Sequence, residues 1–182
     1  MSRRRTPASV GFPPVADGRA RVLVLGSLPG RRSLEAREYY AQPQNAFWRI
    51  MGRLFGAEPS LPYEQRLERL RLGSVALWDV LAAGEREGSL DASIVPASIV
   101  VNDFVSFLAR HRRIGLICFN GRTAAELYRR KVVPMLAPEW AALTTRVLPS
   151  TSPAYASLRF EQKLARWSAA LRPSRRRPAE RG

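Results

Sequence analysis

Four short apolar runs in this chain each lead directly into a turn or a polar loop, and helical patterns separate them. The runs cover residues 22–25, 74–78, 114–119 and 145–148. Short apolar runs bounded by turn residues are typical of buried strands, and their alternation with helices predicts a parallel sheet with helices on both faces. We therefore expect an α/β domain whose strands are joined by right-handed crossovers.

A polar or turn-forming residue follows each of the four predicted strands. These residues are Gly26, Asp79, Asn120 and Ser150. The carboxyl ends of parallel strands share one edge of a sheet, and open α/β folds bind their ligands at that edge. The sequence therefore predicts one crevice lined by these four segments.

Apolar residues at helical spacing predict helices between the strands. We expect helices at residues 33–40 and 102–110, capped by Ser33 and Asn102, and at residues 45–55, 61–72, 123–130 and 157–171. Residues 84–91 should form a polar loop. Residues 94–101 should be irregular because Pro96 has no amide hydrogen to donate.

The length of 182 residues suffices for one domain. We expect a basic flexible arm at residues 1–20, with residues 12–15 extended across the domain, then a single domain at 21–171 and a basic disordered tail at 172–182. There is no run of about 18 apolar residues and no apolar signal stretch. These features predict a cytoplasmic protein, associated with a bacterial nucleoid, that has no membrane partner.

The charge of the chain favours a polyanionic partner. The formal net charge is +15; residues 1–20 carry +3 and residues 171–182 carry +4, which leaves +8 on the rest. A basic surface of this kind makes nucleic acid the first candidate. His111 and Cys118 are the one histidine and the one cysteine, so we predict no metal, no iron–sulfur cluster and no other cofactor.

Three longer motifs point to a family. Residues 26–30 read Gly-Ser-Leu-Pro-Gly, residues 39–48 read Tyr-Tyr-Ala-Gln-Pro-Gln-Asn-Ala-Phe-Trp, and residues 148–154 read Leu-Pro-Ser-Thr-Ser-Pro-Ala. With residues 76–81 and 118–121 between them, they resemble the uracil-DNA glycosylase superfamily, specifically its hypoxanthine-DNA (deoxyinosine) glycosylase branch, over residues 11–170. The resemblance implies a three-layer α/β/α sandwich with a central four-stranded parallel sheet. It also implies a base-excision repair hydrolase that flips a deaminated base out of DNA.

The resemblance implies that Asn45 is the catalytic residue. Many members of the superfamily carry a water-activating Asn or Asp in the first turn, where this chain has Ser27 and Leu28. In the hypoxanthine branch the Asn of the Pro-x-Asn-x-Phe-Trp segment serves instead. A carboxamide does not act as a general base near neutral pH, but it can orient water. The alternative is that Asn45 only caps the helix that follows it.

Base binding is assigned to several residues of the four segments. Tyr40 and Phe47 are candidates for stacking on the flipped base, although either ring could instead belong to the core. Backbone amides of Gly26, Ser27 and Leu28 could bind the base edge or an anionic leaving group. The Asn120 amide could read the N1–H and O6 of hypoxanthine, or it could only form a turn. Asp79 could contact the base, or it could only hold a loop through Arg86 or Ser89.

The segment after the last strand is expected to contact DNA. Ser150, Thr151, Ser152 and Pro153 should grip phosphate through hydroxyl and backbone N–H groups. Ala154 and Tyr155 follow, and the resemblance places this stretch in the minor groove, where Tyr155 could act as a wedge. The branch often has Asn at that position, so Tyr155 is a departure that bears on substrate choice.

These assignments predict a monofunctional DNA glycosylase that acts as a monomer on DNA containing a deaminated base. No lysine stands near any of the motifs in the sequence, and strand cleavage through a Schiff base needs an amine. Hypoxanthine is the first candidate substrate, and uracil and xanthine are alternatives. A DNA-binding protein without catalysis is the alternative of another class.

Overall fold

The computed structural model describes residues 9–86 and 93–171. Its main sheet has four parallel strands in the order β3 (Val75–Asp79), β2 (Val22–Gly26), β6 (Leu116–Asn120) and β7 (Thr144–Leu148). Each begins and ends within two residues of its predicted bounds. The α/β fold with a four-stranded parallel sheet is confirmed.

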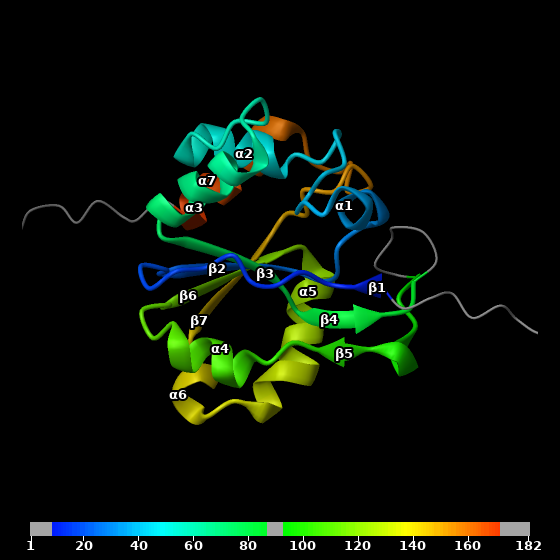
Figure 1. The fold of residues 1–182 in the computed structure, drawn as a ribbon, viewed down its shortest axis with the longest axis vertical. Coiled ribbons are helices and arrows are strands. Elements are labelled where there is room, and N and C mark those ends of the chain that lie inside the picture. Colours follow the sequence, from blue (N-terminus) through cyan, green and yellow to red (C-terminus); the bar gives the residue numbers. More distant parts are fainter. Residues whose placement is uncertain (1–8, 87–92, 172–182) are drawn as a thin grey trace, which may run out of the picture.

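Helices cover both faces of this sheet (Figure 1). On one side lie α2 (Phe47–Phe55), α3 (Tyr63–Leu72) and α7 (Phe160–Leu171), and on the other lie α4 (Phe104–Arg110), α5 (Arg122–Leu127) and α6 (Pro138–Ala141). The short helix α1 (Arg31–Ala36) follows β2. A π-helical turn (Tyr128–Val132) and a 3-10 turn (Val133–Met135) continue α5. The three-layer sandwich is thereby confirmed.

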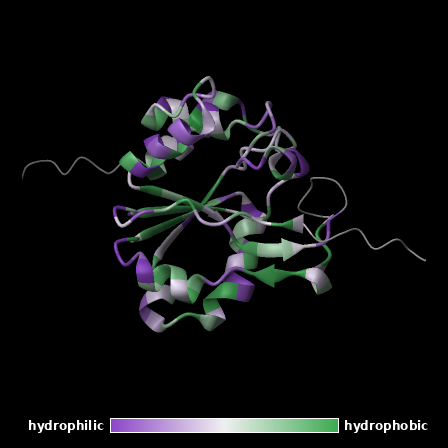
Figure 2. Ribbon diagram, viewed as in Figure 1, coloured by the Kyte–Doolittle hydropathy of each residue, from purple (hydrophilic) through white to green (hydrophobic). Residues whose placement is uncertain are grey.

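The core consists of two apolar clusters, one on each face of the sheet. Along β2, Val24 packs into one cluster, while Leu23 and Leu25 pack into the other. Fully buried aromatic rings fill both sides, with Phe47 and Trp167 on one and Phe104 and Phe107 on the other. Figure 2 shows the hydrophobic strands of the main sheet between the two layers of helices. A strand buried on both faces is what the continuous apolar run in the sequence indicated.

A second, antiparallel sheet was not predicted. It has the order β1 (Ser9–Val10), β4 (Leu81–Gly84) and β5 (Val100–Val101). A 3-10 turn at Pro96–Ser98 precedes β5, in the segment expected to be irregular. Strands of two to four residues are too short to give a readable alternation in sequence.

Residues 9–20 of the expected arm pack on the domain. Val15 forms an antiparallel bridge with Leu77, and the Trp78 indole donates to the carbonyl of Phe12 at 3.0 Å. The extended path predicted for residues 12–15 agrees with this bridge. The rest of the expected arm, the expected tail and most of the polar loop lie outside the described residues.

Two expected helix caps were wrong. Helix α1 begins at Arg31 with Gly30 as its N-cap, so Ser33 lies inside the helix and accepts a hydrogen bond from the Ala41 amide at 3.2 Å. The side chain of Asp103, not Asn102, caps α4 by accepting from the Ser106 amide. Both errors arose because neighbouring residues of similar propensity cannot be ranked without knowledge of where the strand before them ends. Within the described residues, no helix is long and apolar enough to cross a membrane.

Candidate active site

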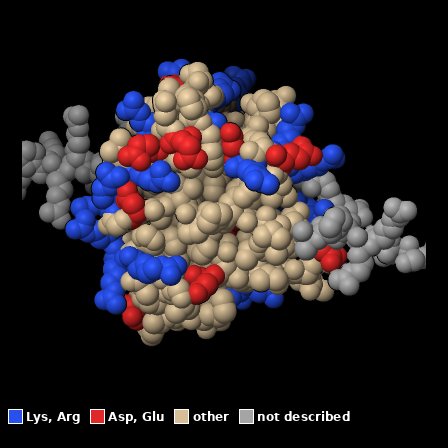
Figure 3. All heavy atoms as spheres, viewed as in Figure 1, with Lys and Arg blue, Asp and Glu red and all other residues tan. Residues whose placement is uncertain are grey.

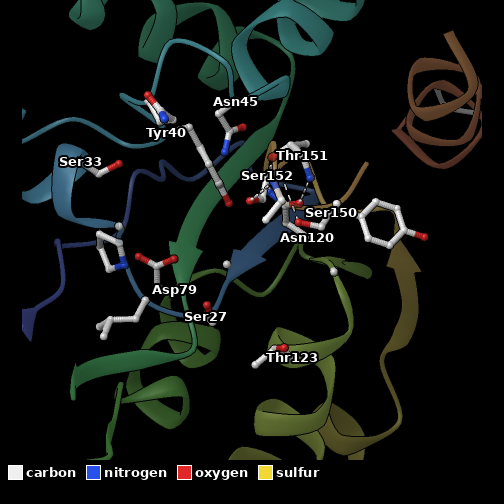
Figure 4. A pocket seen from close by; sticks show the side chains of 18 of the residues that line it. Ser27, Ser33, Tyr40, Asn45, Asp79, Asn120, Thr123, Ser150, Thr151 and Ser152 are labelled. Atoms are coloured by element: carbon white, nitrogen blue, oxygen red, sulfur yellow. Dashed lines mark hydrogen bonds between the residues drawn. The ribbon is translucent and has the colours of Figure 1, made fainter. Parts of the chain in front are cut away.

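A pocket of about 1330 Å³ opens at the carboxyl edge of the main sheet. Gly26, Asp79, Asn120 and Ser150 all line it, so the structure brings together the segments that follow the four strands (Figure 4). Its wall also includes other residues singled out in the sequence: Ser27, Leu28, Tyr40, Asn45, Thr151, Ser152, Pro153, Ala154 and Tyr155. A nucleobase with its sugar fits a space of this size.

Gly26 lets two functional groups approach the backbone at the end of β2. A Cβ atom at this position would lie 2.4 Å from Asp79 Oδ1 and 3.0 Å from the Tyr40 hydroxyl oxygen. Real Cβ atoms essentially never come within 3.0 Å of another atom, so a side chain here would displace the Asp79 carboxylate and crowd the Tyr40 hydroxyl. Asp79 is only 3% exposed. The absence of a side chain at Gly26 therefore sets the place of a buried carboxylate and a phenol in the pocket.

Tyr40 points into the pocket because its backbone is held in the left-handed region, with φ of +54°. Such a conformation is uncommon for a residue with a side chain and persists only where the surroundings enforce it. The Tyr39 amide donates to the Tyr63 hydroxyl at 2.9 Å, and the Trp48 indole donates to the Tyr39 carbonyl at 2.8 Å. Together with the bond from the Ala41 amide to Ser33, these contacts fix both neighbours of Tyr40.

Phe47 does not line the pocket, and its expected direct stacking on a base is wrong. The ring is fully buried and packs behind Tyr40, with ring centroids 4.1 Å apart and planes inclined by 24°. The Trp48 and Trp167 rings stand nearly perpendicular to it, at 82° and 84°. Phe47 therefore supports the Tyr40 ring from the core, and Tyr40 is the ring that a base can reach.

Asn45 lies at the start of α2 and faces the pocket. Its Oδ1 accepts a hydrogen bond from the Phe47 amide at 3.0 Å, and its amide nitrogen points toward the pocket interior (Figure 4). The next residue, Ala46, donates its backbone N–H to the Thr151 carbonyl at 2.9 Å. Asn45 thus both bonds to the first residue of α2 and faces the pocket. The bond between Ala46 and Thr151 joins the start of α2 to the segment after β7.

Asn120 makes two hydrogen bonds to Thr151. Its Nδ2 donates to Thr151 Oγ1 at 2.8 Å, and its Oδ1 accepts from the Thr151 amide at 2.8 Å. One N–H and one acceptor lone pair of the amide are therefore engaged by the protein, which fixes the orientation of the side chain. Thr151 is 1% exposed, so its expected contact with DNA phosphate is wrong. The pair joins the ends of β6 and β7.

Residues 150–155, which we call the serine loop, are braced from inside. Ser150 Oγ accepts from the Ser152 amide and Ser152 Oγ accepts from the Ala154 amide, both at 3.2 Å. These two N–H groups are thus satisfied within the loop, while the hydroxyl hydrogens remain available as donors. Tyr155 lies at the edge of the pocket and its side chain is exposed.

Lys163 lies beneath the serine loop, which corrects the expectation that no lysine is near a motif. It is 5% exposed, and its Nζ donates to the Ser152 carbonyl at 3.4 Å and lies 5.3 Å from the centre of the Tyr155 ring. Burial lowers the pKa of the Lys163 ammonium. Lys163 does not belong to the pocket lining. Its spacing of four from Trp167, another buried residue of α7, was the sequence signal that could have revealed it.

Hydrogen bonds to backbone carbonyl groups hold the turn at residues 26–30, which follows β2. The carbonyls of Gly26 and Ser27 accept from the amides of Val80 and Leu81 at 2.9 and 3.0 Å. The buried Arg86 guanidinium donates to the carbonyls of Leu28, at 3.3 Å, and Pro29. Arg86 thus holds this turn, and Asn102 holds the Asp79 backbone by donating to its carbonyl. Ser89, the other residue expected near Asp79, lies outside the described residues.

Metal-ligating side chains do not gather anywhere in the described part of the chain, where no three His, Cys, Asp or Glu residues are grouped as ligands would be. The residues that line the pocket include amides, hydroxyls, the buried Asp79 carboxylate and the stacked Tyr40 phenol, with arginines around them. Such groups bind a planar polar ligand by stacking and hydrogen bonds.

Comparisons with known proteins identify the family. The family model of the uracil DNA glycosylase superfamily matches residues 13–172. The chain belongs to the uracil-DNA glycosylase superfamily. A curated relative from Methanosarcina acetivorans, named hypoxanthine DNA glycosylase, is 39% identical over 164 residues, which are 89% of this chain and 97% of the relative. One of the same name from Methanosarcina barkeri is 41% identical over 117 residues, covering 64% and 73%.

The fold comparison leads to the same superfamily. The solution NMR structure of a candidate uracil DNA glycosylase from Methanosarcina acetivorans superposes with a TM-score of 0.74 and 37% identity, covering 91% of this chain and 98% of that one. Family membership and the branch inferred from the motifs are thus confirmed.

Proposed function

We propose that this protein is a monofunctional DNA glycosylase that releases hypoxanthine from DNA, acts as a monomer and leaves an abasic site. The observation that carries the proposal is the convergence of Tyr40, Asn45 and Asp79 with the serine loop on one pocket. The two curated relatives named hypoxanthine DNA glycosylase, at 39% and 41% identity, support the choice of base.

The base must leave the helix stack before its glycosidic bond can be reached. In our proposal the flipped base enters the pocket and lies against the Tyr40 ring, which Phe47 supports from behind. Stacking of this kind contributes roughly 1–3 kcal/mol per base and tolerates any base. Discrimination must therefore come from polar groups.

In our proposal Asp79 reads the base edge, while Asn120 is bonded to Thr151. The buried Asp79 carboxylate is a hydrogen-bond acceptor, which suits the N1–H of hypoxanthine. Adenine has a lone pair on N1, so the same placement would set two acceptors against each other. A site that leaves a buried polar group unpaired with the wrong substrate discriminates strongly.

Asn45 holds the water that attacks the sugar. Because Oδ1 accepts from the Phe47 amide, the amide presents its N–H donors to the pocket. A donor can hold a water oxygen, but it does not remove the proton. The reaction therefore relies on departure of the base from an oxocarbenium-like sugar, with water positioned for capture. The C1′–N9 bond breaks as the hypoxanthine takes up a proton from solvent at N7, and the water that forms the new C1′–O bond returns a proton to solvent.

The exposed Tyr155 ring fills the space vacated by the base, as wedge residues do in the minor groove. The Ser150 and Ser152 hydroxyls donate to the neighbouring phosphates. Lys163 stays bonded to the Ser152 carbonyl, outside the pocket lining, so it does not attack the sugar as an amine. This is why we retain a monofunctional mechanism although a lysine is near.

A panel of otherwise identical duplexes tests the proposal, each with one hypoxanthine, uracil or xanthine, and a fourth with adenine at the same site. We expect release of hypoxanthine above the others, no release of adenine, and no covalent complex with borohydride. Preferential uracil release would favour the substrate in the description of the solved relative. No release from any duplex, with binding retained, would favour a DNA-binding protein without catalysis.

A further inference from the structure

Arginine side chains border the pocket on two sides. Arg32, on α1, lies on one side, and Arg122 and Arg166, at the start of α5 and on α7, lie on the other. We call these three the rim arginines. All three are exposed, and none forms an ion pair with a described residue. Their neighbour Arg31 differs, since it pairs with Glu35 at 2.8 Å.

The backbone positions of Arg122 and Arg166 are set by contacts of their neighbours with Ser150 and Pro149. Arg122 follows Gly121, which has φ of +96° and is so close to Ser150 that a Cβ atom would lie 3.1 Å from the Ser150 Cβ. Arg166 precedes Trp167, whose indole donates to the Pro149 carbonyl at 2.9 Å. Both arginines are thereby held next to the loop that we expect to enter the minor groove.

Helix α1, which carries Arg32, lies across the pocket from the serine loop and the start of α5. Figure 4 shows Ser33, the neighbour of Arg32 in α1, on the side opposite Ser150 and Thr123. Helix α1 starts immediately after the first turn, at Arg31. The rim therefore places positive charge on both sides of an opening whose depth holds the buried carboxylate of Asp79.

We propose that the rim arginines bind DNA backbone phosphates on the two sides of the flipped nucleotide, Arg32 on one side and Arg122 with Arg166 on the other. A guanidinium matches phosphate oxygens with paired N–H donors. Each phosphate neutralised by such a contact releases condensed counterions, which makes affinity fall with salt. This inference rests on the proposed function for its ligand, DNA, but not on catalysis.

The test is the salt dependence of binding to a duplex with a tetrahydrofuran abasic-site analogue, measured between 50 and 200 mM KCl. Replacement of each rim arginine by Ala should reduce the slope of log K against log[salt] by about 0.9. Arg32→Ala with Arg122→Ala should reduce it by about 1.8, and Arg→Lys at each site should restore the wild-type slope.

Lysine and arginine side chains are spread over the face of the molecule that Figure 3 shows, so the test needs matched controls. They come from the opposite edge of the sheet. Arg21 precedes β2 and Arg112 precedes β6, and both are exposed. Arg21→Ala and Arg112→Ala should leave the slope unchanged. The proposal is overturned if the rim variants keep the wild-type slope, or if the control variants lose as much as they do.

Binding and turnover separate this inference from the proposed function. If the slopes change as expected but no base is released from any lesion duplex, the rim is supported and the glycosylase proposal fails. If bases are released and the slopes do not change, the glycosylase stands and the rim proposal fails.

Discussion

Asn120 and Thr151 form a reciprocal pair, in which Asn120 Nδ2 donates to Thr151 Oγ1 and the Thr151 amide donates to Asn120 Oδ1, each at 2.8 Å. The pair joins the ends of two neighbouring strands at the pocket edge. Because Thr151 also accepts from the Ala46 amide through its carbonyl, the same residue links β6, the serine loop and the start of α2. Asn120 is thus a positioning residue for Asn45 and for the serine loop together.

Asn120→Ala should lower release of every base by a similar factor. The variant leaves the buried Thr151 hydroxyl and amide unpaired, which costs roughly 1–3 kcal/mol of stability for each unsatisfied group. Asn120→Asp keeps the acceptor for the Thr151 amide and should lose less. Initial rates on the lesion panel, with melting temperatures, check this. A selective gain of adenine release would instead return Asn120 to the role of base reader.

Gly26→Ala should lower turnover by about 10²-fold, because displacement of catalytic groups by an ångström has effects of this size. The added Cβ would meet Asp79 Oδ1 at 2.4 Å and the Tyr40 hydroxyl at 3.0 Å. Gly115→Ala is the matched control, since its Cβ would have no neighbour within 4 Å. Single-turnover rates of both variants are the measurement. Equal rates for the two variants would show that a Cβ atom at position 26 does not disturb the groups that support turnover.

Lys163→Met should impair base flipping more than it impairs binding. The variant keeps the apolar stem but removes the hydrogen bond to the Ser152 carbonyl, so the loop carrying Tyr155 loses its support. Fluorescence of 2-aminopurine beside the lesion reports flipping, and Lys163→Arg should restore part of it. Because burial lowers the pKa of the ammonium, wild-type flipping should decline on the alkaline side before pH 10.5 is reached. Lys163→Met should lack that decline, and an unchanged alkaline profile would contradict the assignment.

Cys118 should resist alkylation in the folded protein. The side chain is fully buried in β6, and burial raises the pKa of its thiol to about 11. The reactive species is the thiolate, whose fraction at pH 8 falls by roughly 100-fold relative to an ordinary thiol with pKa near 9. The test is the rate of iodoacetamide labelling at pH 8. It should be at least roughly 100-fold slower for the folded protein in buffer than for the protein unfolded in urea. Equal labelling rates in buffer and in urea would mean that β6 opens readily in the folded protein.

Much of the fold could be predicted because its signals are local. The apolar runs of β2 and β6 and the glycines after them can be read from neighbouring residues alone. Antiparallel strands β1, β4 and β5 could not be, since their pairing joins residues as distant as Ser9 and Gly84.

The location of the site could be predicted from the sequence, but the contacts that its residues make could not. Tyr40 and Asn45 were found through their motif. Which of Tyr40 and Phe47 faces the pocket depends on the backbone conformation of Tyr40, and the engagement of Asn120 depends on a partner 31 residues away. Neither is encoded in a local pattern. Lys163 was missed for the same reason, because helix geometry and packing bring it under a loop 11 residues earlier.

In our proposal Asn45 positions the water that attacks the sugar while the base lies in the pocket between Tyr40, Asp79 and the serine loop. The most direct test is single-turnover release of hypoxanthine from duplex DNA by the wild type and by Asn45→Ala, with binding to the abasic-site analogue measured alongside. We predict a rate loss of about 10²-fold or more, since a positioning group has been removed, with affinity nearly unchanged. Undiminished release by Asn45→Ala would rule out this role for Asn45.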